Sequence, residues 1–156
     1  MTKYSFEDYN EYNVLKIPLS LILLNLYLLK YIVIFLLPMV SNIPSVKEFS
    51  HEHFTIFLLL PAIPAFLVLI SMIQRVPKSR YVQIINQIWN IGKWLLLLSV
   101  ILEIIIIILY LLLDIKQFGQ TLLIFLYLDS MAIIFLLKSQ RVQDVFTEFP
   151  NNEINF

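Results

Sequence analysis

Three charged residues lie inside long apolar runs of the sequence: Lys30, Glu103 and Asp129. A charge at the centre of a bilayer costs about 2.5–3.5 kcal/mol on insertion scales, so these side chains should face an interior and find partners. An amine and two carboxylates in such a place can form a structural ion pair, or they can bind and pass on a proton or an ion. We expect Lys30 to pair with Glu103, and Asp129 to join them or to take up a proton.

Helix geometry places the three charges at comparable depths. At about 1.5 Å per residue, Glu103 is about 15 Å from Lys93, and Asp129 is about 14 Å from Lys138. Lys30 lies about 6 Å nearer the opposite surface on the same scale, an offset that its long side chain can bridge. Small and polar residues around Glu103 form one helical stripe that we expect to face inward: Gly92, Ser99, Glu103, Tyr110 and Asp114.

Three interpretations of these charges stay open. They can form a salt bridge that fixes the order and register of the helices, or a relay for protons or ions. One of them can also pair with a charged residue on a helix of a partner subunit. Two acids and one base leave one acid without a counter-ion. This acid is consistent with a relay or with a charge on a partner subunit.

The remaining residues that could do chemistry form weak motifs. His51 and His53 flank Glu52 and could bind a metal, but the sequence offers no third or fourth ligand at a suitable spacing. Two solvent-exposed histidines are the simpler interpretation. The chain has no cysteine and no glycine-rich phosphate loop. We therefore expect no enzyme activity, no cofactor, no bound metal and no nucleic-acid partner.

The elements that carry these residues are predicted from composition and run length. Of 156 residues, 60% are hydrophobic and 14% are charged, against about a quarter charged in a soluble domain. Crossing about 30 Å of hydrocarbon takes about 20 apolar residues in a helix. The sequence predicts an all-α polytopic membrane protein with a four-helix transmembrane bundle and short cytoplasmic amphipathic segments. The spans are residues 17–40, 54–73, 94–113 and 118–137, inside a transmembrane domain of 17–137; segments 1–16 and 138–156 are cytoplasmic.

Basic residues set the expected orientation. Eight of them lie in the two end segments and in the connection between spans two and three, against two in the other connections, Lys47 and Lys116. Cytoplasmic loops carry an excess of Lys and Arg, so both ends are predicted to be cytoplasmic. Trp89 and Trp94 are expected among the lipid headgroups beside span three.

Two amphipathic stretches and two prolines complete the pattern. One stretch has an apolar face of Tyr81, Ile84, Ile85 and Ile88, and we expect a helix at the membrane surface or an early start of span three. The second stretch, with Val142, Val145, Phe146 and Phe149, should pack under the bundle or meet a partner before Pro150 ends it. Pro61 and Pro64 are expected to kink span two.

The two ends resemble a known family. They carry YSFEDY at residues 4–9 with LK at 15–16, and SQRVQDVFTEFP at residues 139–150. This pattern is similar to the YfeZ-like family of small bacterial inner-membrane proteins, which has about four spans and no established function. The resemblance implies a bacterial inner membrane and ends that act together. Asp8 and Arg141 would form an ion pair, with apolar contact from Tyr4, Tyr9, Phe146 and Phe149.

Two functional hypotheses follow. The first is a non-enzymatic accessory, scaffolding or self-assembling protein whose partners are the bilayer and a second copy or a larger complex. Its contact surface would be cytoplasmic and comprise Tyr4, Asp8, Tyr9, Arg141, Asp144, Phe146 and Phe149. The second hypothesis is a small proton or ion channel or transporter that uses Lys30, Glu103 and Asp129.

Overall fold

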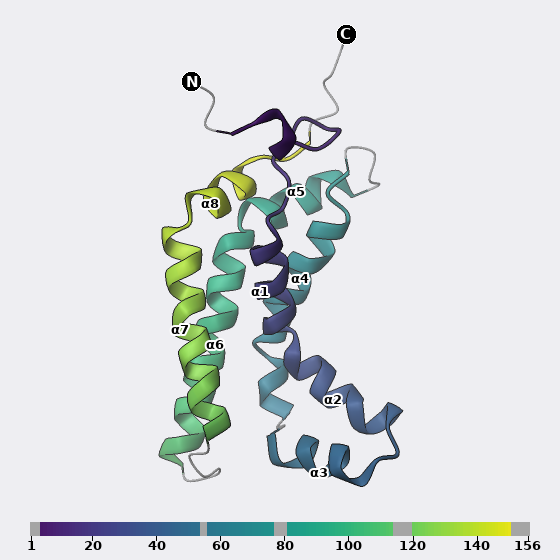
Figure 1. Ribbon diagram of the computed structural model, residues 1–156, viewed down its shortest axis with the longest axis vertical. Helices are drawn as coiled ribbons and strands as arrows, with labels where there is room; N and C mark the ends of the chain where they lie inside the picture. Colours follow the sequence, from purple (N-terminus) through teal and green to yellow (C-terminus); the bar gives the residue numbers. More distant parts are fainter. Residues whose placement is uncertain (1–3, 54–55, 77–80, 114–119, 151–156) are drawn as a thin grey trace.

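The apolar runs fold into helices, and the computed structural model contains no strand within the residues it describes, 4–53, 56–76, 81–113 and 120–150 (Figure 1). The prediction of an all-helical protein is therefore confirmed for this part of the chain. The elements in chain order are η1 (Phe6–Asp8), α1 (Leu19–Leu28), α2 (Lys30–Val40), α3 (Pro44–His53), η2 (Ile56–Leu59), α4 (Ala62–Ile73), α5 (Val82–Asn90), α6 (Gly92–Leu112), α7 (Gln120–Lys138) and α8 (Gln140–Thr147).

Helix α6 is the longest element, and it illustrates why these residues form helices. Its 21 residues give a length of about 31 Å. The run from Ile104 to Ile108 is β-branched and would favour a strand in water, yet it is helical as predicted. A helix satisfies all its backbone hydrogen bonds locally, which outweighs that preference where side chains are apolar on every face.

The first apolar run is not one straight helix. Helices α1 and α2 meet at Leu29 and are bent by 58° relative to each other. The Leu29 amide donates to the carbonyls of Asn25 and Leu26, at 3.2 Å in both cases, so the last turn of α1 is tightened. No proline or glycine lies at the bend, which is why the sequence pattern did not predict it.

The prolines of the second run break the helix rather than kink its middle. Pro61 is the N-cap of α4, and Pro64 lies in its first turn, where an amide has no intrahelical partner and proline is tolerated. The short 3₁₀ helix η2 precedes the break. Residues Ile56–Ile73 together are still long and apolar enough to cross a membrane.

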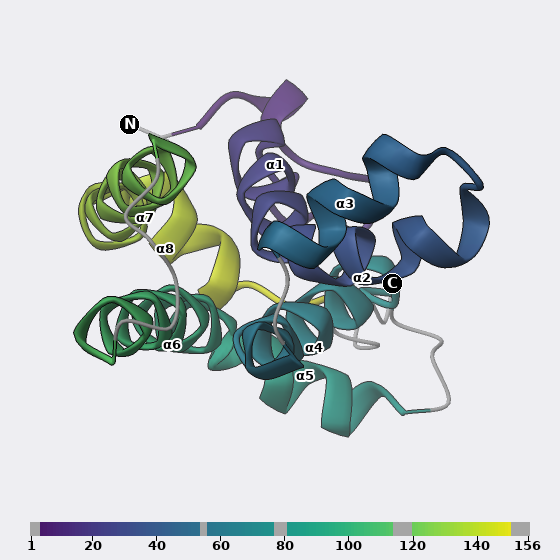
Figure 2. The ribbon, with the colours of Figure 1, turned by 90° about the horizontal axis from the view of Figure 1, so that it is seen from below.

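The long helices pack into a bundle. Helix α6 packs against α4 on one side and α7 on the other, and α1 packs against α4 and α6. Figure 2 shows α6 and α7 side by side on one flank, with α2 and α3 displaced to the opposite flank. Helix α7 turns three inward-facing residues toward the bundle at helical spacing: Asp129, Ala132 and Leu136.

Residues 4–16, α5 and α8 lie together at one end of the bundle, and we call this assembly the terminal cap (Figure 1). Helices α5 and α8 pack against each other and against α6. The amphipathic helix predicted around residues 81–88 is present as α5, but its buried face differs from the predicted one. Ile85 and Trp89 are buried, whereas Tyr81 and Ile84 are more than half exposed, because α8 covers the side of α5 that carries Trp89.

Candidate functional site

The structure brings two of the three predicted charges into direct contact. Lys30 is the first residue of α2, and Glu103 lies in the middle of α6. The Lys30 Nζ atom is 2.5 Å from Glu103 Oε1, and the Glu103 side chain is fully buried. The two groups form an ion pair, but the Lys30 Nζ atom is not oriented to donate a hydrogen bond to the carboxylate. The bend at Leu29 places Lys30 at the start of a new helix, α2, next to the end of α1.

Two tyrosines extend this contact to the third charge. The Tyr31 hydroxyl donates to Glu103 Oε1 at 3.0 Å, and the Tyr27 hydroxyl donates to Asp129 Oδ1 at 2.8 Å. Asp129 itself is fully buried on α7. We call these five residues the buried charge network. It joins α1, α2, α6 and α7, and Asp129 is linked to it through Tyr27.

Aromatic rings surround the Lys30 ammonium group. Its Nζ atom lies 3.8 Å from the centroid of the Tyr27 ring, 4.6 Å from that of Tyr31 and 5.0 Å from that of Phe125. Ring faces attract a cation, and the attraction is stronger in a desolvated site. The contribution of Phe125 was not predicted, because one phenylalanine among many apolar residues gives no signal in sequence.

Several polar atoms of this region lack partners. Glu103 Oε2, Asp129 Oδ2 and the Tyr110 hydroxyl are buried and have no hydrogen-bond partner within the described parts of the chain. Buried polar atoms are usually paired, and unpaired ones commonly mark functional positions or places where small species bind. The network thus has two carboxylates, one ammonium group and unused acceptor capacity on each acid.

The inward-facing stripe of α6 is buried as expected. Gly92, Ser99, Glu103 and Tyr110 all lie in the interior, and Asp114 falls outside the described residues. Ser99 Oγ donates to the Pro61 carbonyl at 2.5 Å, which ties α6 to the broken start of α4. A further buried polar residue, Asn25 on α1, was not singled out in the sequence.

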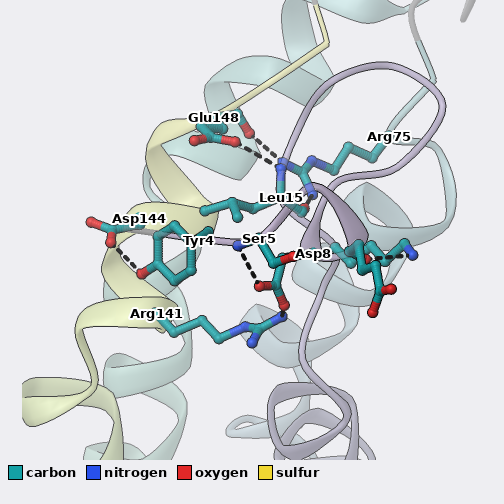
Figure 3. A network of polar contacts seen from close by, with 10 residues as sticks. Tyr4, Ser5, Asp8, Leu15, Arg75, Arg141, Asp144 and Glu148 are labelled. Atoms are coloured by element: carbon teal, nitrogen blue, oxygen red, sulfur yellow. Dashed lines mark hydrogen bonds and ion pairs between the residues drawn. The ribbon is translucent and has the colours of Figure 1, made fainter. Parts of the chain in front are cut away.

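A second polar cluster lies in the terminal cap (Figure 3). Arg141 Nη2 on α8 donates to Asp8 Oδ1 at 2.8 Å, which is the pair implied by the family resemblance. The Tyr4 hydroxyl donates to Asp144 Oδ2 at 2.5 Å. Both contacts join the amino-terminal segment to α8, so the structure does bring the two ends together.

Arg75 forms the buried centre of this cluster. Its Nη1 donates to the Leu15 carbonyl at 2.8 Å and its Nη2 to the Glu148 carbonyl at 2.7 Å. The Glu148 carboxylate in turn accepts from the Leu15 amide at 2.7 Å. Burial lowers the pKa of Arg75 to about 10, although the Glu148 charge acts to raise it. Arg75 was counted only as a cytoplasmic positive charge; its structural role depends on contacts about 60 and 73 residues away, which local patterns do not reveal.

Trp89 was expected to contact lipid headgroups, but its side chain is packed inside the protein. It is fully buried, and its Nε1 donates to the Val145 carbonyl at 2.9 Å and the Glu148 carbonyl at 3.0 Å. Its ring packs against that of Phe146, with the centroids 4.7 Å apart. The indole N–H finds its acceptors at the end of α8, as a buried tryptophan usually requires. Trp94 is exposed, at 65%.

The predicted contact surface is largely occupied by the chain itself. Phe146 is buried against Trp89 and Gly92, and Phe149 and Tyr9 pack on the same core. The Phe146 ring is therefore not accessible to a partner while α8 is docked. A hollow of about 300 Å³ lies beside these residues and is lined by Tyr4, Phe6, Tyr9, Asn10 and Asn13. Phe6 at its rim is 96% exposed.

The structure does not test the predicted histidine motif. The backbone of His51 and His53 belongs to α3, but their side chains lie outside the described residues. In the part of the chain that was searched, no three His, Asp or Glu side chains gather in a way that could hold a metal ion.

These features define an all-helical protein with helices able to cross a membrane by length and composition: two alone, or up to four if each bent pair is one span. Residues 4–148 match the family described as "Protein of unknown function (DUF2919)", and the chain belongs to that family. The match supports an uncharacterised family, as expected, but not the YfeZ-like name. No curated protein and no solved structure matches the chain.

Proposed function

We propose that the protein is an integral protein of the bacterial inner membrane that crosses the bilayer four times with both ends in the cytoplasm. The first span would be α1 together with α2, and the second would be η2 together with α4. Helices α6 and α7 would be the third and fourth spans; the 19 residues of α7 give a length of about 28 Å. Two observations support this topology. The first and last described residues lie at the same end of the bundle (Figure 1). Five of the seven basic residues that the structure describes belong to or adjoin the elements at that end: Lys16, Arg75, Lys93, Lys138 and Arg141.

The absence of cysteine from the sequence makes this topology easy to test. Ser45→Cys lies at the end of the bundle opposite to Thr147→Cys, and both native side chains are exposed. A membrane-impermeant maleimide applied to intact spheroplasts should label the first variant and should label the second only after lysis. Labelling of both from outside, or of neither before lysis, would contradict the topology.

Within this membrane layout, the proposed function is non-enzymatic association: an accessory, scaffolding or self-assembling role. The observation that carries it is the aromatic hollow of the terminal cap, with Phe6 almost fully exposed at its rim. Aromatic side chains dominate the affinity of protein interfaces, and exposed ones commonly mark contact sites. The hollow includes Tyr4 and Tyr9 of the predicted contact surface and adds Phe6. Its occupant would be a second copy or a subunit of a larger membrane complex.

The association proposal is tested by removing the exposed ring. Protein carrying Phe6→Ala should lose an oligomer or a co-purifying subunit in mild detergent, with an unchanged unfolding midpoint. Glu11→Ala is a control in the same segment, outside the residues that line the hollow. The proposal fails if the wild type is monomeric and partner-free, or if Phe6→Ala keeps its partner.

A second candidate, a small proton or ion channel or transporter, is favoured by the unpartnered oxygens of Glu103 and Asp129. Buried acids inside spans commonly mark proton or ion pathways. Purified protein in liposomes should then show a flux that Asp129→Asn abolishes without loss of folding. Folded wild-type protein that carries no flux would eliminate this candidate.

A further inference from the structure

The two acids of the buried charge network have unequal surroundings. Glu103 Oε1 has both the Lys30 ammonium group, at 2.5 Å, and the Tyr31 hydroxyl, at 3.0 Å. Asp129 has one hydroxyl donor, Tyr27. Within the described residues, no cationic atom forms an ion pair with the Asp129 carboxylate. The single positive charge is therefore committed to Glu103.

An ionised Asp129 would consequently be a buried anion without a counter-ion. Its residue has no solvent exposure, and an uncompensated charge in a low-dielectric interior costs several kcal/mol. A neutral carboxylic acid avoids this cost and can still accept the hydrogen bond from Tyr27. The oxygen that lacks a partner, Oδ2, is the free position for the proton.

We propose that Asp129 is a proton-binding site: it holds an exchangeable proton on Oδ2 at neutral pH, while Lys30 and Glu103 form a fixed ion pair beside it. In the binding step, Oδ2 takes a proton from a hydronium ion, which leaves as water; in the release step, the proton returns to water. This inference deepens the second candidate function by naming the group that binds the proton. It is independent of the association proposal.

The groups that face Asp129 define the electrostatics of this site. Tyr27 on α1 donates to it, Lys30 on α2 lies over the Tyr27 ring, and Glu103 lies across from α7 on α6. Tyr127 on the same helix as Asp129 is two-thirds exposed. Because Glu103 neutralises Lys30, the protonation of Asp129 should depend on that pair. Removing the lysine should leave two acids that both need a proton.

Infrared spectroscopy of the full-length protein in lipid vesicles detects this proton directly. The carbonyl stretching band of a protonated carboxylic acid should be present at neutral pH and should shift in heavy water, since the proton exchanges. Carbon-13 labelling of aspartate in the wild type should shift the band, and labelling of glutamate should not. This comparison needs no variant, so a folding defect cannot obscure it.

Variants add further outcomes. Asp129→Asn should remove the band, Tyr27→Phe should keep it at a shifted frequency, and Lys30→Met should roughly double its intensity as Glu103 also becomes protonated. The proposal is overturned if the wild type lacks the band or if the band follows the glutamate label. It is also overturned if the band appears only when sodium and potassium are removed, since a metal cation would then occupy the site. A band without flux would leave this site standing while eliminating the transport candidate.

Discussion

At the residue scale, the most informative side chains are polar groups in an apolar protein. Lys30 and Glu103 could be paired from the sequence because both lie deep in apolar runs and a lysine can span the offset between them. The partners of Arg75 could not be predicted in this way. Its partners are backbone carbonyls, which every residue carries, so no residue type in the sequence indicates them.

Arg75→Gln should destabilise the terminal cap. It leaves the Leu15 and Glu148 carbonyls without their charged donor, at a cost on the order of 2–4 kcal/mol. Arg75→Lys should recover only part of this, because an ammonium group lacks the planar fork that serves two carbonyls. Trp89 fluorescence during thermal unfolding measures the effect. An unchanged midpoint in Arg75→Gln would contradict the role.

The contribution of Arg75 should also be constant around neutral pH. Its pKa of about 10 in the folded protein and its ordinary value of 12.5 both lie above that range, so folded and unfolded chains carry the same charge. Above about pH 10 the unfolded chain binds more protons at this site than the folded chain does. The contribution of Arg75 to the free energy of unfolding should therefore rise with pH between about pH 10 and 12.5, because the folded chain no longer has to bury a charge there.

At the element scale, the positions and approximate lengths of the helices could largely be predicted from the sequence, but the bends between them could not. The apolar runs, the amphipathic stretches around α5 and α8, and the inward stripe of α6 all follow from periodicity. The bend at Leu29 could not be predicted, because the sequence has no proline or glycine there. The buried face of α5 was assigned wrongly because Trp89 packs on α8, and only the tertiary arrangement shows that contact.

The close approach of α6 and α8 at Gly92 gives a test at this scale. A methyl group added to Gly92 would lie 2.5 Å from Phe146 Cε1 and 2.9 Å from Cδ1. Gly92→Ala should therefore cost about 1–3 kcal/mol by overpacking. Adding Phe146→Leu to the same chain should restore part of the loss, because the smaller side chain vacates that space. Equal unfolding midpoints for Gly92→Ala and wild type would show that α8 does not dock there.

At the scale of the whole molecule, two polar assemblies hold an apolar bundle at different levels. The terminal cap joins residues 4–16, α8 and α5, and the buried charge network joins α1, α2, α6 and α7. With few glycines available for close backbone contact, polar side chains and large apolar ones must set how the helices fit. The proposed association surface is the hollow of the terminal cap that Tyr4, Phe6 and Tyr9 line.

A double-mutant cycle on Lys30 and Glu103 most directly tests whether this pair organises the bundle. Lys30→Met and Glu103→Gln should each destabilise the protein by about 3–5 kcal/mol, because each leaves a buried group without its partner. The variant with both changes should be more stable than either single variant, since no uncompensated charge is left. Unfolding midpoints in mild detergent provide the measurement. If the two losses simply add, the residues are not partners, and the buried charge network described here is wrong.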